Sequence, residues 1–276
     1  MSCYRLFGAT LAAREQLTPS FIRITLSGPL ADVSPTLLDQ RVKLVVGEPQ
    51  LLAELSAADD WFESWRTMGA AAPAIRTYTL SGIRPDPGGA GEVDIDVVLH
   101  PGSMGPASTF AATAPLGSTV GLVAGDRTLE GHDQVGLGWH PAGADQFMLV
   151  ADETALPAVA NILATLDDHA TGEAYLEVPT AGDVRDLARP AGMLVHWFVR
   201  ERGEGALDAL PLGACPPLQF PDEEPLWDEG TGGDWYGWVA GESGWVRQIR
   251  AIAKASGRPL AQMSLMGYWK KGGALG

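Results

Sequence analysis

FMLVADETALPAVANILATL, residues 147–166, is the stretch that decides the fold of the second half of the chain. An apolar run, FMLVA, is followed by a segment whose apolar residues recur at helical spacing from near Thr154 onward. Two further apolar runs follow, AYLEV at 174–178 and MLVHWFV at 193–199. Apolar strands that alternate with helical segments are typical of a parallel α/β sheet covered on both faces.

The same pattern continues towards the C-terminal end of the chain. WYGWVAGE at 235–242 predicts a strand, the stretch that begins at Ser243 predicts a helix, and MSLMGYW at 263–269 predicts a last strand. Residues 211–233 are rich in proline, glycine and acidic side chains, and they predict a surface loop. We therefore expect one α/β domain over residues 146–276.

The first half of the chain has a different pattern. Short apolar runs separated by turn signals are typical of antiparallel strands, and they occur at 21–26, 42–46, 92–100 and 118–125. In EVDIDVVLH, the third run, apolar and acidic residues alternate as in a half-buried strand. Several short strands with one intervening helix predict an antiparallel β-barrel over residues 1–125. Residues 126–145, with many glycines, predict a connection or a hairpin insertion between the two domains.

The composition excludes several classes of protein. A chain of 276 residues has the length of two ordinary domains, and its net charge of −15 disfavours binding to nucleic acid or to acidic membranes. Two cysteines, Cys3 and Cys215, fit neither a disulfide framework nor a metal motif, and they cannot supply the four thiolates of an iron–sulfur cluster. The chain shows neither the continuous apolar core of a signal peptide nor a membrane-spanning run. We therefore expect a cytoplasmic protein without membrane insertion.

Two segments of the predicted barrel have the residue types of a phosphate and ring-binding site. In Arg76-Thr77-Tyr78-Thr79, strand alternation places Arg76 and Tyr78 on one face, where an arginine can bind phosphate and a ring can pack on a flat heterocycle. Residues 105–108, Gly-Pro-Ala-Ser, begin a helix whose free N–H groups can hold phosphate. Each segment alone is equally compatible with an ordinary strand or an ordinary capped helix. Together they favour a flavin dinucleotide.

Two further segments are more ambiguous. The turn at 151–157, Ala-Asp-Glu-Thr-Ala-Leu-Pro, joins the first α/β strand to its helix, which is where nucleotides usually bind, but it lacks the glycine fingerprint of a dinucleotide fold. Its two acidic residues are also explained by stabilisation of the helix dipole. Lys270 and Lys271 form either a solvated tail or an electropositive rim for an anionic ligand.

These segments, taken in order, resemble the siderophore-interacting proteins, FAD-dependent ferric-siderophore reductases of the ferredoxin-reductase-like superfamily. The resemblance extends over nearly the whole chain, in VKL at 42–44, RTYTL at 76–80, VVLH and GPAS within 97–108, ADETALPAVANIL at 151–163, WVAGE at 238–242 and GYWKKG at 267–272. It implies an N-terminal antiparallel FAD-binding β-barrel, followed by a C-terminal α/β parallel-sheet domain that binds a nicotinamide nucleotide.

The resemblance also implies roles for individual residues. Residues of the barrel would hold the flavin and its phosphates: Arg76, Tyr78, Thr79, Val98, His100, Gly105, Pro106, Ala107 and Ser108. Residues at the strand ends of the second domain would border the nicotinamide: Asp152, Glu153, Thr154, Ala155, Ala240, Gly241 and Glu242. Three lysines would attract the ferric chelate: Lys43, Lys270 and Lys271. The flavin would carry the chemistry, so the resemblance implies neither a nucleophile nor a metal ligand.

The implied activity is reduction of a ferric siderophore by NADPH or NADH through FAD. Reduction of Fe(III), a hard ion held by oxygen ligands, to Fe(II) weakens the chelate and frees the iron. Three alternatives stay open: a flavin reductase with another acceptor, a reductase that takes electrons from ferredoxin, and a siderophore-binding module without turnover. The choice between NADH and NADPH is open too, because Arg200 and Arg202 either contact a 2′-phosphate or are ordinary surface arginines.

Overall fold

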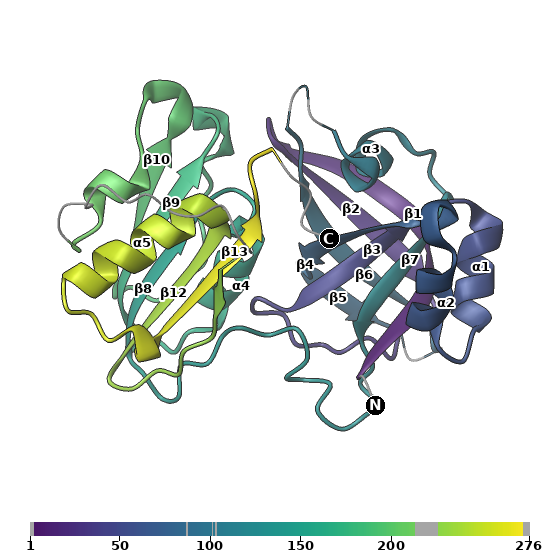
Figure 1. The fold of residues 1–276 in the computed structure, drawn as a ribbon, viewed down its shortest axis with the longest axis horizontal. Coiled ribbons are helices and arrows are strands. Elements are labelled where there is room, and N and C mark those ends of the chain that lie inside the picture. The colour runs from purple at the N-terminus through teal and green to yellow at the C-terminus, as the bar shows by residue number, and fades with distance from the viewer. Residues whose placement is uncertain (1–2, 87, 101, 103, 213–225, 273–276) are drawn as a thin grey trace. The chain divides into compact units, whose positions relative to one another are not determined.

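The chain folds into two compact units, residues 1–137 and 138–276 (Figure 1). The structure is a computed structural model, and it describes residues 3–86, 88–100, 102, 104–212 and 226–272. The first unit is an antiparallel β structure and the second is an α/β structure, which confirms the predicted fold class. Among the described residues, none of the helices has the length and apolar character needed to cross a bilayer. Cys3 is a free thiol, and Cys215 lies outside the described residues.

The first unit is built on a curled seven-stranded antiparallel sheet with the order β4-β3-β7-β1-β2-β6-β5. Its strands are β1 (Tyr4–Thr18), β2 (Phe21–Gly28), β3 (Arg41–Val46), β4 (Ala74–Thr79), β5 (Gly82–Pro85), β6 (Gly91–Val98) and β7 (Thr119–Gly125). The inner face packs a buried core that includes Ile24, Val42, Leu44 and Leu122, and helix α3 (Pro106–Thr113) adds Ala107 and other residues to it.

The opposite face of this sheet carries two helices that the sequence pattern did not predict. α1 (Pro49–Ala57) and α2 (Trp61–Thr67) lie between β3 and β4 in the chain, and α1 packs Leu52 and Leu55 against Val45 and Val123. The expectation of one intervening helix is therefore wrong. Strand β1 was also missed, because its pairing with β2 shifts register twice and a shifted strand loses the simple two-residue alternation.

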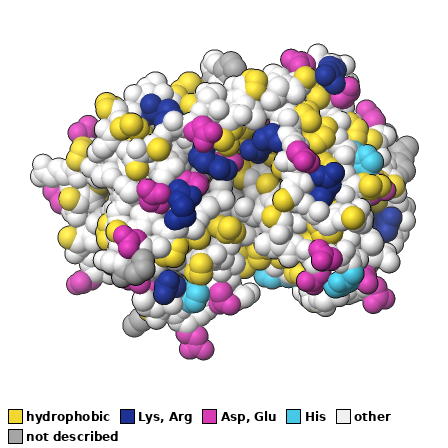
Figure 2. All heavy atoms as spheres, turned by 180° about the vertical axis from the view of Figure 1, so that it is seen from behind, with side chains coloured by type: hydrophobic (Ala, Val, Ile, Leu, Met, Phe, Trp, Pro, Cys, Tyr) yellow, Lys and Arg dark blue, Asp and Glu magenta, His cyan; other side chains and the backbone are white. Residues whose placement is uncertain are grey.

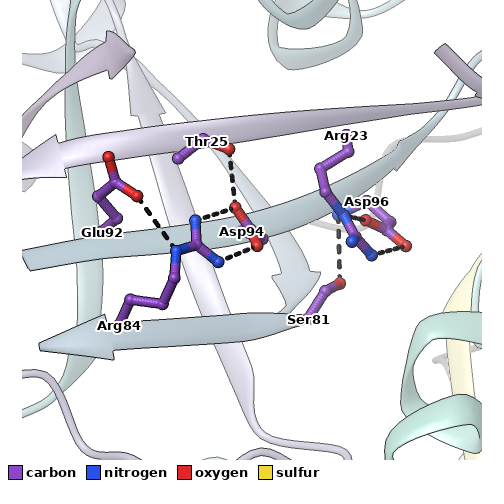
Figure 3. Close-up of polar contacts among 7 residues, drawn as sticks. All are labelled: Arg23, Thr25, Ser81, Arg84, Glu92, Asp94 and Asp96. Carbon is purple, nitrogen blue, oxygen red and sulfur yellow. Dashed lines mark hydrogen bonds and ion pairs between the residues drawn. The ribbon is translucent and has the colours of Figure 1, made fainter. Parts of the chain in front are cut away.

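Two of the three acidic side chains of β6 are buried, so the strand is more deeply buried than the half-buried strand that we expected. Asp94 and Asp96 are only 6% and 5% exposed. Arg84 donates to Asp94 at 2.8 Å, and Arg23 donates to Asp96 at 2.7 Å (Figure 3). Because each buried carboxylate is paired with a guanidinium, β6 can bury both of its faces.

The second unit contains a six-stranded sheet with the order β10-β9-β8-β12-β13-β11. Its strands are β8 (Gln146–Ala151), β9 (Thr171–Val178), β10 (Met193–Val199), β11 (Trp227–Asp228), β12 (Trp235–Glu242) and β13 (Met263–Trp269). Five strands run parallel, and the two-residue β11 pairs antiparallel with β13. The chain moves from β8 to β9 in one direction and from β12 to β13 in the other. Right-handed crossovers therefore place α4 (Leu156–Thr165) and α5 (Ser243–Ala255) on opposite faces (Figure 1).

Two details of the second half differ from the sequence prediction. Helix α4 begins at Leu156 rather than near Thr154, because Thr154 forms a turn with Asp152 instead. The hairpin alternative for residues 126–145 is wrong, since they form turns and one isolated bridge between Asp126 and Val33. Of the predicted loop 211–233, residues 213–225 lie outside the described residues, and residues 227–228 form β11.

Candidate functional site

Arg76 and Tyr78 lie on the inner face of the curled sheet. In the register of β3 with β4, Arg76 is opposite Leu44 and Tyr78 is opposite Val42, and both of these partners are core residues. β4 is an edge strand, and β3 is its only strand partner in the described part of the chain. The other side of β4 therefore pairs with no strand in the described part of the chain.

Arg76 and Tyr78 have complementary chemistry. Arg76 donates to the backbone carbonyl of Ile75 at 2.7 Å and has no acidic partner among the described residues. Burial raises the pKa of Tyr78 to about 12, with Arg76 opposing the shift, so the phenol stays neutral at pH 7. The pair offers an uncompensated cation beside an apolar ring.

The N-terminal end of α3 faces the same core. Ala107 belongs to the buried cluster against which Tyr78 packs, and α3 contacts β4. Gly105 caps the helix without a side-chain hydrogen bond, and the space that a Cβ would occupy there is empty for 4 Å. The first N–H groups of a helix have no internal partner, so those of Ala107 and Ser108 are available to an anion.

Lys43 lies on the other face of the same sheet. It is opposite Thr77 in the β3–β4 register, and its Nζ donates to Thr77 Oγ1 at 3.2 Å. Burial, and then the nearby Arg41, lower the pKa of Lys43. The structure thus separates Lys43 from Arg76 and Tyr78, and its contact with a chelate stays a prediction.

The remaining predicted residues of the first unit lie at strand ends. Thr79 ends β4 and is buried, whereas Val98 ends β6 and is half-buried, as is His100 just after it. Alternation places Val98 on the side of β6 that carries Asp96 rather than on the core side. Contact of these residues with a ring system stays a prediction.

In the second unit, Asp152 is a buried junction of three parallel strands. It follows β8 and accepts four hydrogen bonds: from Thr154 N at 2.8 Å, Thr154 Oγ1 at 2.6 Å, Glu242 N at 2.8 Å and Trp269 Nε1 at 2.7 Å. Glu242 ends β12 and Trp269 ends β13. Burial and the neighbouring Glu153 raise the pKa of Asp152 to about 6. At pH 7 it is a carboxylate saturated by protein donors, which indicates a structural role.

Gly241 is required by this junction. A Cβ at Gly241 would lie 2.7 Å from Cγ of Asp152. Any other residue would push the carboxylate away from the end of β12. Asp152 also contacts several of the positions predicted to border a nicotinamide. These positions include Thr154, Ala155 and Glu242.

Glu153 turns inward as well. It is 1% exposed, and its Oε1 lies 2.6 Å from Nη2 of Arg200, which follows β10. The same guanidinium lies 3.3 Å from Glu177 Oε1 near the end of β9. This bridge was not predicted, because Glu153 and Arg200 are far apart in the sequence. The one available signal was the unusual presence of two acidic residues before a helix expected to bind phosphate.

The two C-terminal lysines follow β13. Lys270 is half-buried and Lys271 is exposed, and the backbone N–H of Lys271 donates to Glu242 Oε1 at 3.2 Å. On the face drawn in Figure 2, acidic and basic side chains lie interspersed, so the net negative charge forms no single patch there. A role for these lysines in attracting a chelate stays a prediction.

Two family models match separate parts of the chain, one in each unit. Residues 10–128 match the siderophore-interacting FAD-binding domain, and residues 144–272 match the siderophore-interacting protein model. The chain belongs to the siderophore-interacting protein family.

The chain matches only part of the first curated relatives. The chain is 30% identical to the mycobactin import ATP-binding/permease protein IrtA of Mycolicibacterium smegmatis over 97% of its own length and 26% of that protein. It is also 30% identical to the ferric vibriobactin reductase ViuB of Vibrio cholerae, over 72% of its own length and 66% of that protein. The chain thus spans about a quarter of IrtA and just under two thirds of ViuB.

Solved structures agree with the family assignment. A siderophore utilization protein from T. fusca is 26% identical and superposes with a TM-score of 0.72, covering 100% of this chain and 97% of that one. A ferredoxin reductase in carbazole 1,9a-dioxygenase, 14% identical, superposes with a TM-score of 0.57 over 96% of this chain and 68% of that one. The second likeness shows the fold alone, which is ferredoxin-reductase-like.

Proposed function

We propose that this siderophore-interacting protein is an FAD-dependent reductase that passes electrons from NADH or NADPH to a ferric siderophore. The observation that carries the proposal is Arg76, a cation on the inner face of the sheet, beside the ring of Tyr78, that has no acidic partner among the residues that the structure describes. The likeness to ViuB, whose name describes a ferric vibriobactin reductase, supports the choice of acceptor.

The residues of the first unit fit FAD. A dinucleotide needs cations or N–H donors for its phosphates and apolar surface for its ring. Arg76 and the N–H groups of Ala107 and Ser108 would hold the phosphates, and the empty space at Gly105 lets them approach. Tyr78 would pack on the ring through its half-buried, neutral phenol.

FAD, when bound, supplies the conversion of a two-electron hydride donor into one-electron reduction of Fe(III). One nicotinamide nucleotide would reduce two ferric chelates and release one proton. We assign nucleotide binding to the carboxyl ends of β8 and β12, where the strand order reverses and Thr154, Ala155 and Glu242 meet. Lys270 and Lys271 would add local positive charge for an anionic chelate.

An anaerobic spectroscopic titration tests the whole proposal. The purified protein is loaded with FAD, NADH or NADPH is added, and a ferric siderophore follows in the presence of a colorimetric Fe(II) trap. We expect the flavin absorbance to bleach with nucleotide and to return as trapped Fe(II) appears. A protein that stays colourless with FAD would overturn the flavin assignment. If reduced ferredoxin bleaches the flavin and neither NADH nor NADPH does, the assignment of a nicotinamide nucleotide as the electron donor is overturned.

Arg76→Gln tests the residue that carries the proposal. We expect its FAD affinity to fall on the order of tenfold or more, because a charged hydrogen bond to phosphate is lost. The matched control is Arg66→Gln on α2, which removes the same charge from an exposed pair with Glu63. Equal FAD affinity in the two variants would contradict the role of Arg76.

A further inference from the structure

One guanidinium links the carboxyl ends of three neighbouring strands in the second unit. Arg200 follows β10 and bonds to Glu153, after β8, and to Glu177, near the end of β9. Glu177 is held from its other side too, because its Oε2 accepts the backbone N–H of Ala206 at 3.1 Å. The three charged groups therefore have fixed positions within the sheet.

This bridge lies at the edge of the sheet where a nucleotide would bind. The chain passes from β8 through β9 to β10 on one side and then returns to β12 and β13 on the other. Nucleotides bind outside the carboxyl ends of such strands. An acidic residue near the end of the second strand is typical of sites for an adenosine ribose 2′-hydroxyl, and an arginine nearby is typical of sites for a 2′-phosphate. This chain has both residue types there, and they are bonded to each other.

The charges around the bridge are predominantly negative. Arg200 faces two carboxylates, Glu153 and Glu177, so the three groups together carry one negative charge. Two more carboxylates are fixed at the same strand ends: Glu201 accepts the N–H of Ala181 at 2.7 Å, and Glu204 accepts that of Val199 at 2.9 Å.

Arg202 is a further cation at these strand ends. It is exposed, and no ion pair involves it among the described residues. With Arg202 included, and with Asp183 and Arg185 of the segment that follows β9, three guanidinium groups lie among five carboxylates in the described residues.

A 2′-phosphate at this edge would be repelled. A phosphate that drew Arg200 away from Glu153, which is 1% exposed, would leave a buried carboxylate without its cation, and such an unpaired charge is strongly unfavourable. A ribose 2′-hydroxyl needs no cation, and a carboxylate with free lone pairs can accept from it. The arrangement tolerates the hydroxyl and disfavours the phosphate.

We propose that the Glu153–Arg200–Glu177 bridge makes this protein select NADH over NADPH, with Glu177 as the specificity-determining residue and Arg200 as the group that positions it. The inference rests on the proposed function, since it concerns the donor of the same reaction.

Two nucleotide fragments that cannot transfer hydride test the selection directly. Isothermal titration of the FAD-loaded protein with 5′-AMP and with adenosine 2′,5′-bisphosphate measures the 2′-phosphate contribution alone. We expect 5′-AMP to bind on the order of tenfold more tightly. Equal or tighter binding of the bisphosphate would overturn the inference and leave the reductase proposal intact. If neither fragment binds, the assignment of the nucleotide site to these strand ends is overturned as well.

Glu177→Gln tests the residue assignment. Removing one carboxylate leaves the guanidinium with a single acidic partner, so the affinity ratio of 5′-AMP to the bisphosphate should fall on the order of tenfold. Glu173→Gln is the matched control, because Glu173 lies on the same strand and pairs with His196 instead. Its ratio should equal that of the wild type. If both variants change the ratio equally, general charge rather than Glu177 sets it. The wild-type ratio tests the selection even if Glu177→Gln fails to fold.

Discussion

The indole N–H of Trp269 donates to Oδ2 of the buried Asp152 at 2.7 Å, and this bond fastens the end of β13 to the turn after β8. The backbone N–H of Glu242 donates to the same oxygen. One carboxylate oxygen therefore aligns the ends of three parallel strands at the edge where we place the nucleotide. Lys270 and Lys271 follow Trp269 directly, so the bond also fixes where the lysine pair begins.

Trp269→Phe should lower the free energy of unfolding by about 1–2 kcal/mol. Phenylalanine keeps most of the apolar ring but leaves Asp152 with three of its four donors. Urea unfolding at pH 7 measures the loss. The matched control is Trp227→Phe, whose indole donates to Glu229 at 2.7 Å on the exposed surface. A surface pair contributes little, so the control should change by less than about 0.5 kcal/mol, and equal losses would contradict the role of the buried junction.

Asp152 should also make stability depend on pH. Its pKa is raised from 3.8 to about 6 by burial and by Glu153, so the folded protein binds more protons than the unfolded chain between these values. Stability from this group is therefore largest at low pH and falls as the pH rises from about 4 to about 6. The free energy of unfolding of the wild type minus that of Asp152→Asn should be greater at pH 4 than at pH 7.5, by about 2–3 kcal/mol. Urea unfolding at both pH values measures it, and a difference independent of pH would contradict the shift.

The strands that the sequence could locate share a simple physical pattern. β8 and β13 are short apolar runs bounded by polar residues, and a run of this kind can only be buried. β1 has no such pattern, because its register shifts move side chains from one face to the other. α2 has no buried residue at all among its seven, so no apolar stripe marks it in the sequence.

The candidate site was predictable only where its residues are close in sequence. Arg76 and Tyr78 share a face by alternation within one strand, and the structure places them so. The face of Lys43 depends on how β3 pairs with β4, which no local pattern specifies. The Glu153–Arg200 pair depends on a parallel crossover that brings distant strand ends together. Pairings set by tertiary structure are therefore the part that the sequence could not supply.

Asp94→Asn should destabilise the first unit by about 1–3 kcal/mol at pH 7. Asp94 accepts from Arg84 and from Thr25 (Figure 3), and the Arg84 hydrogen bonds hold the pKa of Asp94 below its ordinary value. This stability is present above about pH 4 and is lost as the pH falls through the lowered pKa. Thermal unfolding measures it. Glu92→Gln is the control, because Glu92 is an exposed partner of the same Arg84, and a larger effect there would contradict the argument.

Arg14 connects β1 to the C-terminal end of α3. Its guanidinium donates to the carbonyls of Phe110, Ala111 and Ala114. A cation at a helix C-terminus satisfies the last carbonyls and complements the helix dipole. We assign the N-terminal end of α3 to the phosphates of FAD. Because α3 is a short helix, Arg14 would hold this N-terminal end in place through its contacts at the C-terminal end.

Arg14→Met should therefore weaken FAD binding on the order of fivefold, equivalent to about 1 kcal/mol, while riboflavin binding stays unchanged. Riboflavin has the ring system but no pyrophosphate, so it does not use the N-terminal end of α3. Flavin fluorescence titrations of the apoprotein measure both affinities. Arg127→Met is the control, because Arg127 is an exposed arginine of the same unit, and it should change neither affinity. Equal losses for FAD and riboflavin in Arg14→Met would mean that Arg14 supports the unit as a whole, whereas a selective loss for FAD places its effect at the phosphate end of α3.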